Sequence, residues 1–203
     1  YIHIFNKEVS RAVRSGDAHD NPHVAKAAKA IREAINKVTK DAQDLGLFKG
    51  ETAVALDLMG AQSYLPRMIL HDVIDNNIEE FINVVVAWQR AHISVIPDNL
   101  DDKLAIAIRS GNAEQHTAII RKQALRLARK LSGVEDYDIE ATDIAGSMKG
   151  RSIWVDDNVL AGDNTKYGGS GHSFLENDVN AIMKTWMPQI HTDIELTKQF
   201  GSV

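Results

Sequence analysis

Two helix-rich regions of the chain are joined by the stretch Gln62-Ser63-Tyr64-Leu65-Pro66-Arg67-Met68. Within it, Tyr64 offers apolar surface, Pro66 fixes one backbone angle, and Arg67 provides several hydrogen-bond donors. These properties predict a rigid knuckle between helices, with Arg67 bound to a carboxylate or to the carbonyl groups at a helix end. The knuckle does not indicate catalysis, because Ser63 is not in a strand–turn–helix elbow that would expose a nucleophile.

The composition of the chain is that of an ordinary globular protein. Its 203 residues are 44% hydrophobic and 25% charged. The formal net charge of -5 argues against a dedicated nucleic-acid-binding domain, because such domains are usually basic. The absence of cysteine excludes disulfides and thiolate metal sites. No apolar run approaches the roughly 20 residues that a membrane-spanning helix needs, so no such segment is expected.

The start of the chain is apolar. Residues Tyr1 to Phe5 are expected to be strand-like, and a short amphipathic stretch follows them. An apolar first residue is an unusual free and solvated terminus. We therefore expect this chain to be a piece of a longer polypeptide.

The strongest helical pattern follows Asn21. This residue can cap the free amide groups of a helix, and Pro22 suits the first helical position because it has no N–H group to satisfy. Gly46 is a natural end for the same helix. Between them, apolar residues recur at steps of three and four: Val24, Ala28, Ile31, Ile35, Val38, Ala42 and Leu45. This spacing predicts an amphipathic helix with one buried face.

Further helices are predicted downstream. Residues 76–92 are apolar on most sides, which is typical of a buried helix. Asp98 is expected to cap the next helix, with Asp101 in its first turn. Gly111-Asn112 is expected to divide that helix from another, which ends at Gly133.

The last third of the chain begins with a different composition. Residues 134–172 are rich in glycine, aspartate and asparagine, with a strand-like island at 151–155. We expect this region to be an extended arm, either docked on a neighbour or mobile. Ser173 and Glu176 have the spacing of a capping box, which predicts that the last helix begins at Ser173. Pro188 is expected to kink or restart that helix.

These elements predict a mainly α fold. The expected architecture is an irregular multi-helix bundle with a glycine-rich extended arm between the penultimate and last helices. The expected domains are a helical domain at 1–133, an extended glycine-rich arm or linker at 134–172, and a C-terminal helical segment at 173–203.

Neither a metal site nor a cofactor site is predicted. His19 and His23 are four residues apart, but Pro22 places His23 at a helix start and leaves His19 in the preceding loop. The glycines at 162–171 match neither phosphate-binding loop. The stretch Gly168-Gly169-Ser170-Gly171 is interpreted as a flexible linker.

His71, with Asp72 and Asp75 nearby, leaves one enzymatic alternative open. A catalytic histidine needs a nucleophile or a remote acid held within hydrogen-bond distance. The sequence offers no such group in a recognisable setting, so we expect no enzymatic activity and no catalytic residue. The alternative hypothesis remains a stand-alone helical enzyme that uses His71 and these carboxylates.

One helical face is strongly basic. Lys122, Arg126, Arg129 and Lys130 lie on it, opposite an apolar face, and no acidic residue occurs from Arg121 to Lys130. This face is either a solvated surface or a docking surface for an acidic partner or DNA phosphates. The second interpretation gives another alternative function, that of a DNA-contacting helical module.

Trp154 is the most prominent aromatic residue of the glycine-rich region. Aromatic residues on extended arms often anchor interfaces, and tryptophan is equally common in cores. Trp154 is therefore a candidate partner contact, with burial in the core as the alternative.

Short motifs spread over most of the chain suggest a family. They are Phe5-Asn6-Lys7-Glu8-Val9 with Asn21-Pro22-His23-Val24-Ala25-Lys26-Ala27-Ala28-Lys29, then Ser63-Tyr64-Leu65-Pro66-Arg67, and Phe174-Leu175-Glu176-Asn177-Asp178 with Phe200-Gly201. In this order they resemble a segment of the large internal virion, or DNA-ejection, proteins of tailed bacteriophages.

The resemblance implies a structural role inside the virion, near the portal or the DNA-ejection channel. It implies a homo-oligomer that contacts other virion proteins, such as portal or ejection proteins, and possible non-specific contact with packaged DNA. Proteins of that family often contain a lytic transglycosylase elsewhere in the polypeptide, and the setting of its catalytic glutamate is absent from this chain. The implied role is therefore non-enzymatic.

Overall fold

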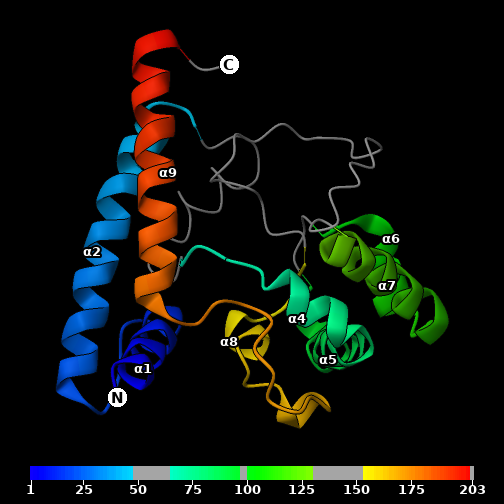
Figure 1. Ribbon diagram of the computed structural model, residues 1–203. Helices are drawn as coiled ribbons and strands as arrows, with labels where there is room; N and C mark the ends of the chain where they lie inside the picture. The colour runs from blue at the N-terminus through cyan, green and yellow to red at the C-terminus, as the bar shows by residue number, and fades with distance from the viewer. Residues whose placement is uncertain (48–64, 97–99, 130–152, 202–203) are drawn as a thin grey trace. The chain divides into compact units, whose positions relative to one another are not determined.

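The protein is mainly helical. A computed structural model describes residues 1–47, 65–96, 100–129 and 153–201 (Figure 1). These residues contain eight α-helices and two short 3-10 helices. Within the described ranges the only β-type pairing is a single antiparallel bridge between Ile69 and Leu175. The prediction of a mainly α, multi-helix fold is confirmed.

The described residues form two compact units. Unit 1 contains residues 1–47, 65–67 and 177–201, and unit 2 contains residues 68–96, 100–129 and 153–176. The predicted domain boundaries at 133/134 and 172/173 divide the chain differently. Unit 1 joins the first and last helices of the chain, and unit 2 joins the middle helices to the described part of the glycine-rich region.

Unit 1 consists of three helices. They are α1 (Ile2–Arg14), α2 (Pro22–Asp44) and α9 (Val179–Phe200). In Figure 1, α2 and α9 lie side by side and α1 packs against them, and all three pairs are in contact. The buried face of α2 includes Val24, Ala28, Ile35, Val38 and Ala42, as its apolar spacing predicted.

The start of α1 corrects the prediction that Tyr1 to Phe5 are strand-like. The helix begins at Ile2, directly after its N-cap Tyr1, so residues 2–5 form its first turn. The reason is periodicity: Ile2 and Phe5 extend the helical stripe of Val9 and Val13, which is buried. The first five residues alone do not show this helical spacing. It is visible only when they are considered together with Val9 and Val13.

The limits of α2 agree with the sequence analysis. The Asn21 side chain accepts a hydrogen bond from the His23 amide, and Pro22 occupies the first turn. The helix ends at Asp44, and Gly46 follows with a φ of +69°, a conformation that glycine adopts without strain.

A buried arginine connects α1 to α2. Arg32 is only 5% exposed, and its guanidinium donates to the Val13 carbonyl at the end of α1. Arg32 Nε also lies 3.3 Å from Asp17 Oδ2. Asp17 adopts a φ of +65°, which is unusual for a residue other than glycine. The α1–α2 turn is thus held by a charged hydrogen-bond network as well as by apolar packing.

The start of α9 differs from the predicted capping box. The helix begins at Val179, and Asp178 is its N-cap, with a side chain that accepts from the Asn180 and Ala181 amides. Ser173 instead donates its hydroxyl to the Leu175 carbonyl. The capping-box spacing is therefore coincidental, because residues 174–176 are extended and paired rather than helical.

Near its middle, α9 runs through Pro188 without restarting. The helix continues to Phe200. Gly201 then ends it with a φ of +82°.

Asp178 also ties α9 to α1. His3 Nδ1 lies 3.0 Å from one carboxylate oxygen, and Asn6 donates to the other at 2.9 Å. Partial burial acts to raise the pKa of Asp178, but these side-chain contacts and the two helix amides lower it below its usual value.

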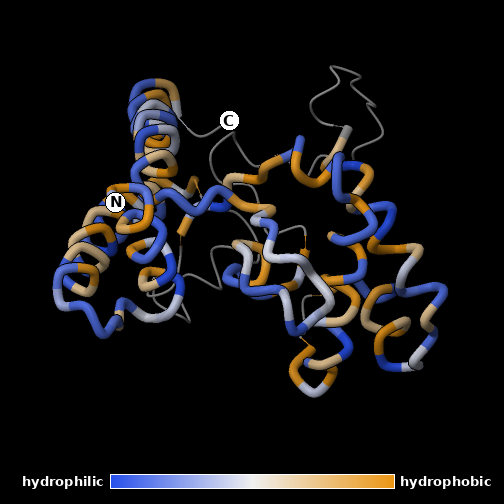
Figure 2. The backbone as a smooth tube through the Cα atoms, turned by 60° about the horizontal axis from the view of Figure 1, so that its bottom comes forward, coloured by the Kyte–Doolittle hydropathy of each residue, from blue (hydrophilic) through white to orange (hydrophobic). Residues whose placement is uncertain are grey.

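Unit 2 is built on two long helices and several short elements. Its helices are α4 (His71–Asn76), α5 (Ile78–Ala91), α6 (Asp102–Arg109), α7 (Ala113–Arg129) and α8 (Asp157–Leu160), with 3-10 turns η1 (Ile93–Val95) and η3 (Thr165–Tyr167). Figure 2 shows hydrophilic and hydrophobic residues alternating along the helices, as expected of amphipathic elements. The predicted helix at 76–92 is α5, separated from α4 by a turn at Asn77.

The cap of α6 is shifted from the prediction. Asp98 lies outside the described residues, and the N-cap is Asp101, whose side chain accepts from the Leu104 amide. The predicted division at Gly111-Asn112 is confirmed, because α6 ends at Arg109 and α7 begins at Ala113. Gly133 lies outside the described residues.

The expectation of an extended arm needs a correction for residues 153–172. Ile153, Val155, Val159 and Leu160 are buried in the core of unit 2, together with side chains of α5 and α7. This segment includes α8 and η3, and residues 153–155 form bends rather than a strand. Although this segment contains several glycines, its apolar residues pack into the core of unit 2, so the segment is not an extended arm.

The segment after the predicted knuckle is extended and paired. The Leu70 amide donates to the Phe174 carbonyl at 3.0 Å, and the Glu176 amide donates to the Met68 carbonyl at 2.8 Å. Pro66 is buried and Arg67 is half-buried, whereas Tyr64 lies outside the described residues. Helix α4 starts directly after this pairing, at His71.

Candidate functional site

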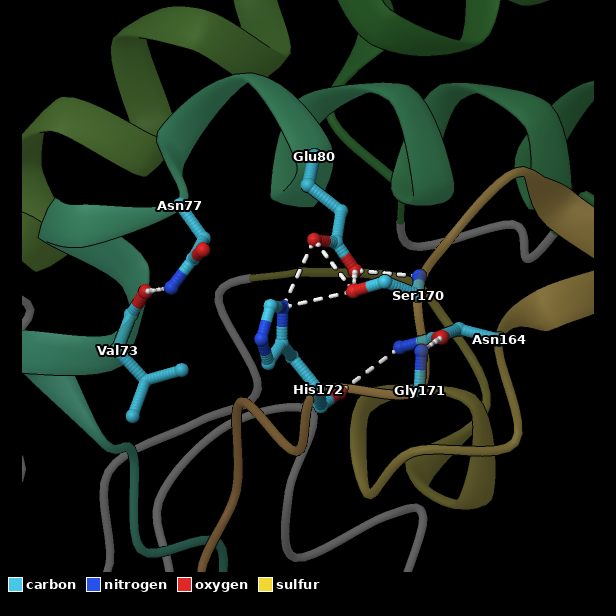
Figure 3. Close-up of polar contacts among 7 residues, drawn as sticks. All are labelled: Val73, Asn77, Glu80, Asn164, Ser170, Gly171 and His172. Carbon is cyan, nitrogen blue, oxygen red and sulfur yellow. Dashed lines mark hydrogen bonds and ion pairs between the residues drawn. The ribbon is translucent and has the colours of Figure 1, made fainter.

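The densest polar cluster of unit 2 is centred on Glu80 of α5 (Figure 3). Its carboxylate accepts from the Ser170 amide at 2.7 Å and from the Ser170 hydroxyl at 2.8 Å. His172 Nδ1 lies 2.8 Å from Glu80 Oε2 and 2.8 Å from the Ser170 hydroxyl. One carboxylate therefore joins α5 to a loop about 90 residues further along the chain. We call Glu80, Ser170 and His172 the Glu80 clamp.

The loop in the clamp is organised by a buried asparagine. Asn164 has no exposed surface, and its amide group donates to the His172 carbonyl while its Oδ1 accepts from the Gly171 amide. Its backbone carbonyl accepts from the Tyr167 and Gly169 amides. These bonds replace the regular hydrogen bonding that the loop lacks.

Gly169 is required by close packing rather than by backbone conformation. A Cβ atom at this position would lie 2.3 Å from Asn164 Oδ1 and 2.9 Å from a methyl group of Val84. The stretch 168–171 was interpreted as a flexible linker. Gly169 in this stretch instead packs against the buried side chains of Asn164 and Val84, so this loop is an ordered part of the fold.

The Glu80 clamp has serine, histidine and carboxylate groups but not the geometry of a catalytic triad. In a triad, one ring nitrogen of histidine faces the serine and the other faces the carboxylate. Here the same nitrogen, His172 Nδ1, faces both groups, and the Ser170 hydroxyl donates directly to Glu80. This arrangement holds a loop and does not activate the serine hydroxyl.

The electrostatics of the clamp favour an ionised carboxylate. Partial burial acts to raise the pKa of Glu80, but donation by the Ser170 amide, the His172 ring and the Ser170 hydroxyl lowers it below its usual value. Beside the clamp, Asn77 donates its side-chain amide to the Val73 carbonyl at 2.9 Å and closes the end of α4 (Figure 3).

A second polar network lies inside unit 2. His116 of α7 is 1% exposed, and its Nε2 lies 2.6 Å from Gln89 Oε1. Gln89 in turn donates to the Trp154 carbonyl at 2.8 Å. Burial, and secondarily the charge of Arg90, lowers the pKa of His116 below its usual value. The neutral imidazole thus links α5, α7 and residues 153–155.

Two side chains of the predicted basic face, Lys122 and Arg126, are among those that the structure describes. Lys122 and Arg126 are exposed on α7, whereas Ile120 and Ala124 on the opposite face are buried. Among the described residues, no carboxylate lies within ion-pair distance of either cation. Arg129 is the last residue of α7, and Lys130 lies outside the described residues.

Arg121, next to this face, pairs with Glu79 of α5. Its Nη2 atom lies 2.7 Å from Glu79 Oε2, and this contact is at the surface. Arg121 is therefore engaged within unit 2, in contrast to Lys122 and Arg126.

Trp154 is half-buried, which is intermediate between the two predicted alternatives, an exposed partner contact and a buried core residue. Its ring packs edge-on against Trp88, with centroids 5.3 Å apart, and Trp88 stacks on His92 at 4.2 Å. The Tyr167 ring is tilted against His92, with a centroid distance of 6.2 Å. The aromatic side chains therefore contact one another within unit 2.

His19 and His71, which were considered for metal binding and for catalysis, have other partners. His19 Nδ1 accepts from the Asn21 amide, so its Nε2 holds the proton and donates to Glu8 at 3.1 Å. His71 Nδ1 donates to the Leu127 carbonyl at 2.6 Å, which ties α4 to α7, and Asp72 is exposed. No cluster of three potential metal ligands occurs among the described residues.

The sequence analysis missed the residues of the Glu80 clamp and its organising residue, Asn164. An asparagine four to seven residues before several glycines is a local signal of an ordered turn. No local pattern identifies Glu80 as the partner, because it is distant in sequence. The buried His116 was likewise missed, although it lies on the apolar side of α7.

The chain matches no known family model, no curated protein and no solved structure. Among the described helices, none is long and apolar enough to cross a bilayer. A functional assignment therefore rests on the arrangement of the residues themselves and on the motifs noted in the sequence.

Proposed function

We propose that this chain is a non-enzymatic structural segment of a tailed-phage internal virion, or DNA-ejection, protein. It would act in the virion, near the portal or the ejection channel, as one of several identical copies that contact other virion proteins. The family part of this proposal rests on the motif resemblance. The structural part rests on the geometry of the two units.

The observation that carries the structural part is an exposed apolar turn at the start of α1. Ile2 is 71% exposed and Ile4 is 64% exposed, beside the fully exposed Tyr1 and the partly exposed Phe5. Ile4 lies on nearly the opposite side of the helix from the buried Val9, so exposed apolar side chains occupy more than one side of this turn, with the polar His3 between them. Contiguous exposed apolar surface of this kind marks a surface that another molecule covers.

The polar clusters of the chain support the same proposal. The groups of the Glu80 clamp bond to one another, and His71 bonds to a backbone carbonyl. Their hydrogen-bonding capacity holds elements together. This use is typical of a protein whose function is shape and assembly.

The experiment that tests assembly compares the wild-type chain with I2S/I4S. We expect the wild type to form a discrete oligomer in light scattering after size-exclusion chromatography, and the variant to shift toward the monomer. I106S is a matched control, because Ile106 is an exposed apolar residue of unit 2, and this variant should leave the oligomer unchanged. Equal oligomeric states for all three proteins would contradict assembly through this turn.

The phage assignment needs its own measurement. Purified particles of the phage that encodes the chain should contain it in multiple copies, located inside the capsid or at the portal by cryo-electron microscopy. A gene outside any phage structural region, with no copies in particles, would refute this assignment.

A second candidate function, contact with DNA through α7, is supported by the exposure of Lys122 and Arg126 without a described ion-pair partner. Charge reversal in K122E/R126E should then weaken DNA binding and reduce the steepness of its salt dependence. DNA binding whose affinity and salt dependence are unchanged by this reversal would exclude the α7 face.

A further inference from the structure

The outer face of α2 holds a row of exposed lysines. They are Lys26, Lys29, Lys37 and Lys40, and we call them the α2 lysine stripe. At 3.6 residues per turn they fall within an arc of about 80°. Glu33 is the one acidic residue within this row, and Asp41 and Asp44 follow at its C-terminal end. The stripe therefore has an excess of positive charge over most of the helix.

The lysines of the stripe have no described carboxylate partner. Every lysine in it is exposed, and no ion pair joins any of them to a carboxylate within the parts of the chain that the structure describes. In contrast, Arg32 on the inner side of α2 is buried and pairs with Asp17. The charge of the stripe is thus available to a partner, and the positive end of the helix dipole at Asn21 adds to it.

The chemistry of the stripe fits a phosphate backbone better than a protein. No large apolar side chain of α2 is exposed. Protein interfaces usually need aromatic or aliphatic anchors at their centre and are depleted of lysine there. A phosphate backbone requires only positive charges that replace its condensed counterions.

The length of the stripe also fits duplex DNA. The 14 helical steps from Lys26 to Lys40 span about 21 Å, which is the length of about six base pairs. The net charge of the whole chain is -5, but charges more than about 10 Å away are largely screened at moderate salt. The local positive field therefore decides the contact at short range.

We infer that the α2 lysine stripe binds the phosphate backbone of duplex DNA without reading its sequence. This inference names a surface on unit 1 that is separate from the α7 face. It rests on the charge of α2 and holds whether or not the chain belongs to a virion.

The test is a fluorescence-anisotropy titration of the 203-residue chain with a labelled mixed-sequence duplex. Four phosphate contacts predict a slope of log affinity against log salt of about -3.6 between roughly 50 and 200 mM salt. The K29Q/K37Q variant should reduce the steepness of this slope by about two, and K26Q/K29Q/K37Q/K40Q should abolish measurable binding.

Three controls make the result specific. Replacement of the same four lysines by arginine retains the charge and should retain binding. E33Q removes the acidic residue of the stripe and should tighten binding. Circular dichroism should show the same helicity for every variant, because these side chains are exposed.

Two outcomes would overturn the inference. The first is wild-type binding that is absent, or unchanged in the fourfold glutamine variant. The second is binding that K122Q/R126Q abolishes while K29Q/K37Q leaves it intact, which would assign the contact to α7. Neither outcome bears on assembly through α1, because that property is measured by light scattering without DNA.

Discussion

At the scale of single residues, unit 2 depends on a few atoms with no room to move. Asn164 is fully buried, and its side chain bonds to both Gly171 and His172. Gly169 leaves no space for a Cβ atom against Asn164 and Val84. The loop is therefore closely packed around Asn164 and Gly169, although it has little regular secondary structure.

The variant G169A should destabilise the protein by about 1–3 kcal/mol, because a backbone shift is needed to relieve the contacts of the new methyl group. The measurement is urea unfolding followed by circular dichroism. G111A is a matched control, because its methyl group meets open space and its cost of about 1 kcal/mol comes only from the positive φ. A G169A loss no greater than that of G111A would contradict the packing argument.

At the scale of elements, His116 connects α7 to α5 and to residues 153–155. Its bond to Gln89 uses the neutral ring, and burial lowers its pKa below the usual value of 6.5. The unfolded chain therefore binds a proton more readily than the folded chain. Stability from this group is fully present above pH 6.5 and is lost as the pH falls through the lower folded value.

We expect the free energy of unfolding of the wild type to fall as the pH decreases below 6.5. In H116Q, the non-ionisable side chain should make this decrease smaller. Urea titrations at a series of pH values measure both slopes, and H23Q serves as the control because His23 is exposed. Identical pH dependence in wild type and H116Q would exclude the histidine as the cause.

Elements with local end signals could be predicted from the sequence, and elements defined by distant partners could not. Helix α2 has both its cap and its stop within its own residues, so its limits were predicted closely. The start of α9 was misplaced because Ser173 and Glu176 imitate a capping box, while pairing with residues 68–70 keeps that segment extended. The Glu80 clamp requires knowledge of a contact across about 90 residues, which periodicity does not provide.

At the scale of the whole molecule, the two ends of the chain stabilise one unit and the middle stabilises the other. Helix α9 contributes five buried residues to unit 1: Val179, Ile182, Trp186, Ile190 and Ile194. The core of unit 2 contains none of them. Loss of α9 should therefore affect the two units unequally.

Truncation of the chain after Asn177 removes α9, and α1 and α2 should lose their protection against amide hydrogen exchange. Protection in α5 and α7 should remain, because their core lies within unit 2. Hydrogen-exchange mass spectrometry resolves the two regions, with the full-length chain as the reference. A uniform loss of protection in both regions would show that the chain folds as one cooperative unit.

The pairing of residues 68–70 with residues 174–176 has a mechanical consequence. If the chain is pulled by its two ends, the load falls first on α1 and α9, which are held together through Asp178. Tension reaches Met68 and Glu176 only after those helices separate. At that point the backbone bonds of Leu70 and Glu176 resist it, and they have to break before the helices of unit 2 are extended. The order of rupture under force is therefore set by the chain topology: α9 yields before α5 and α7.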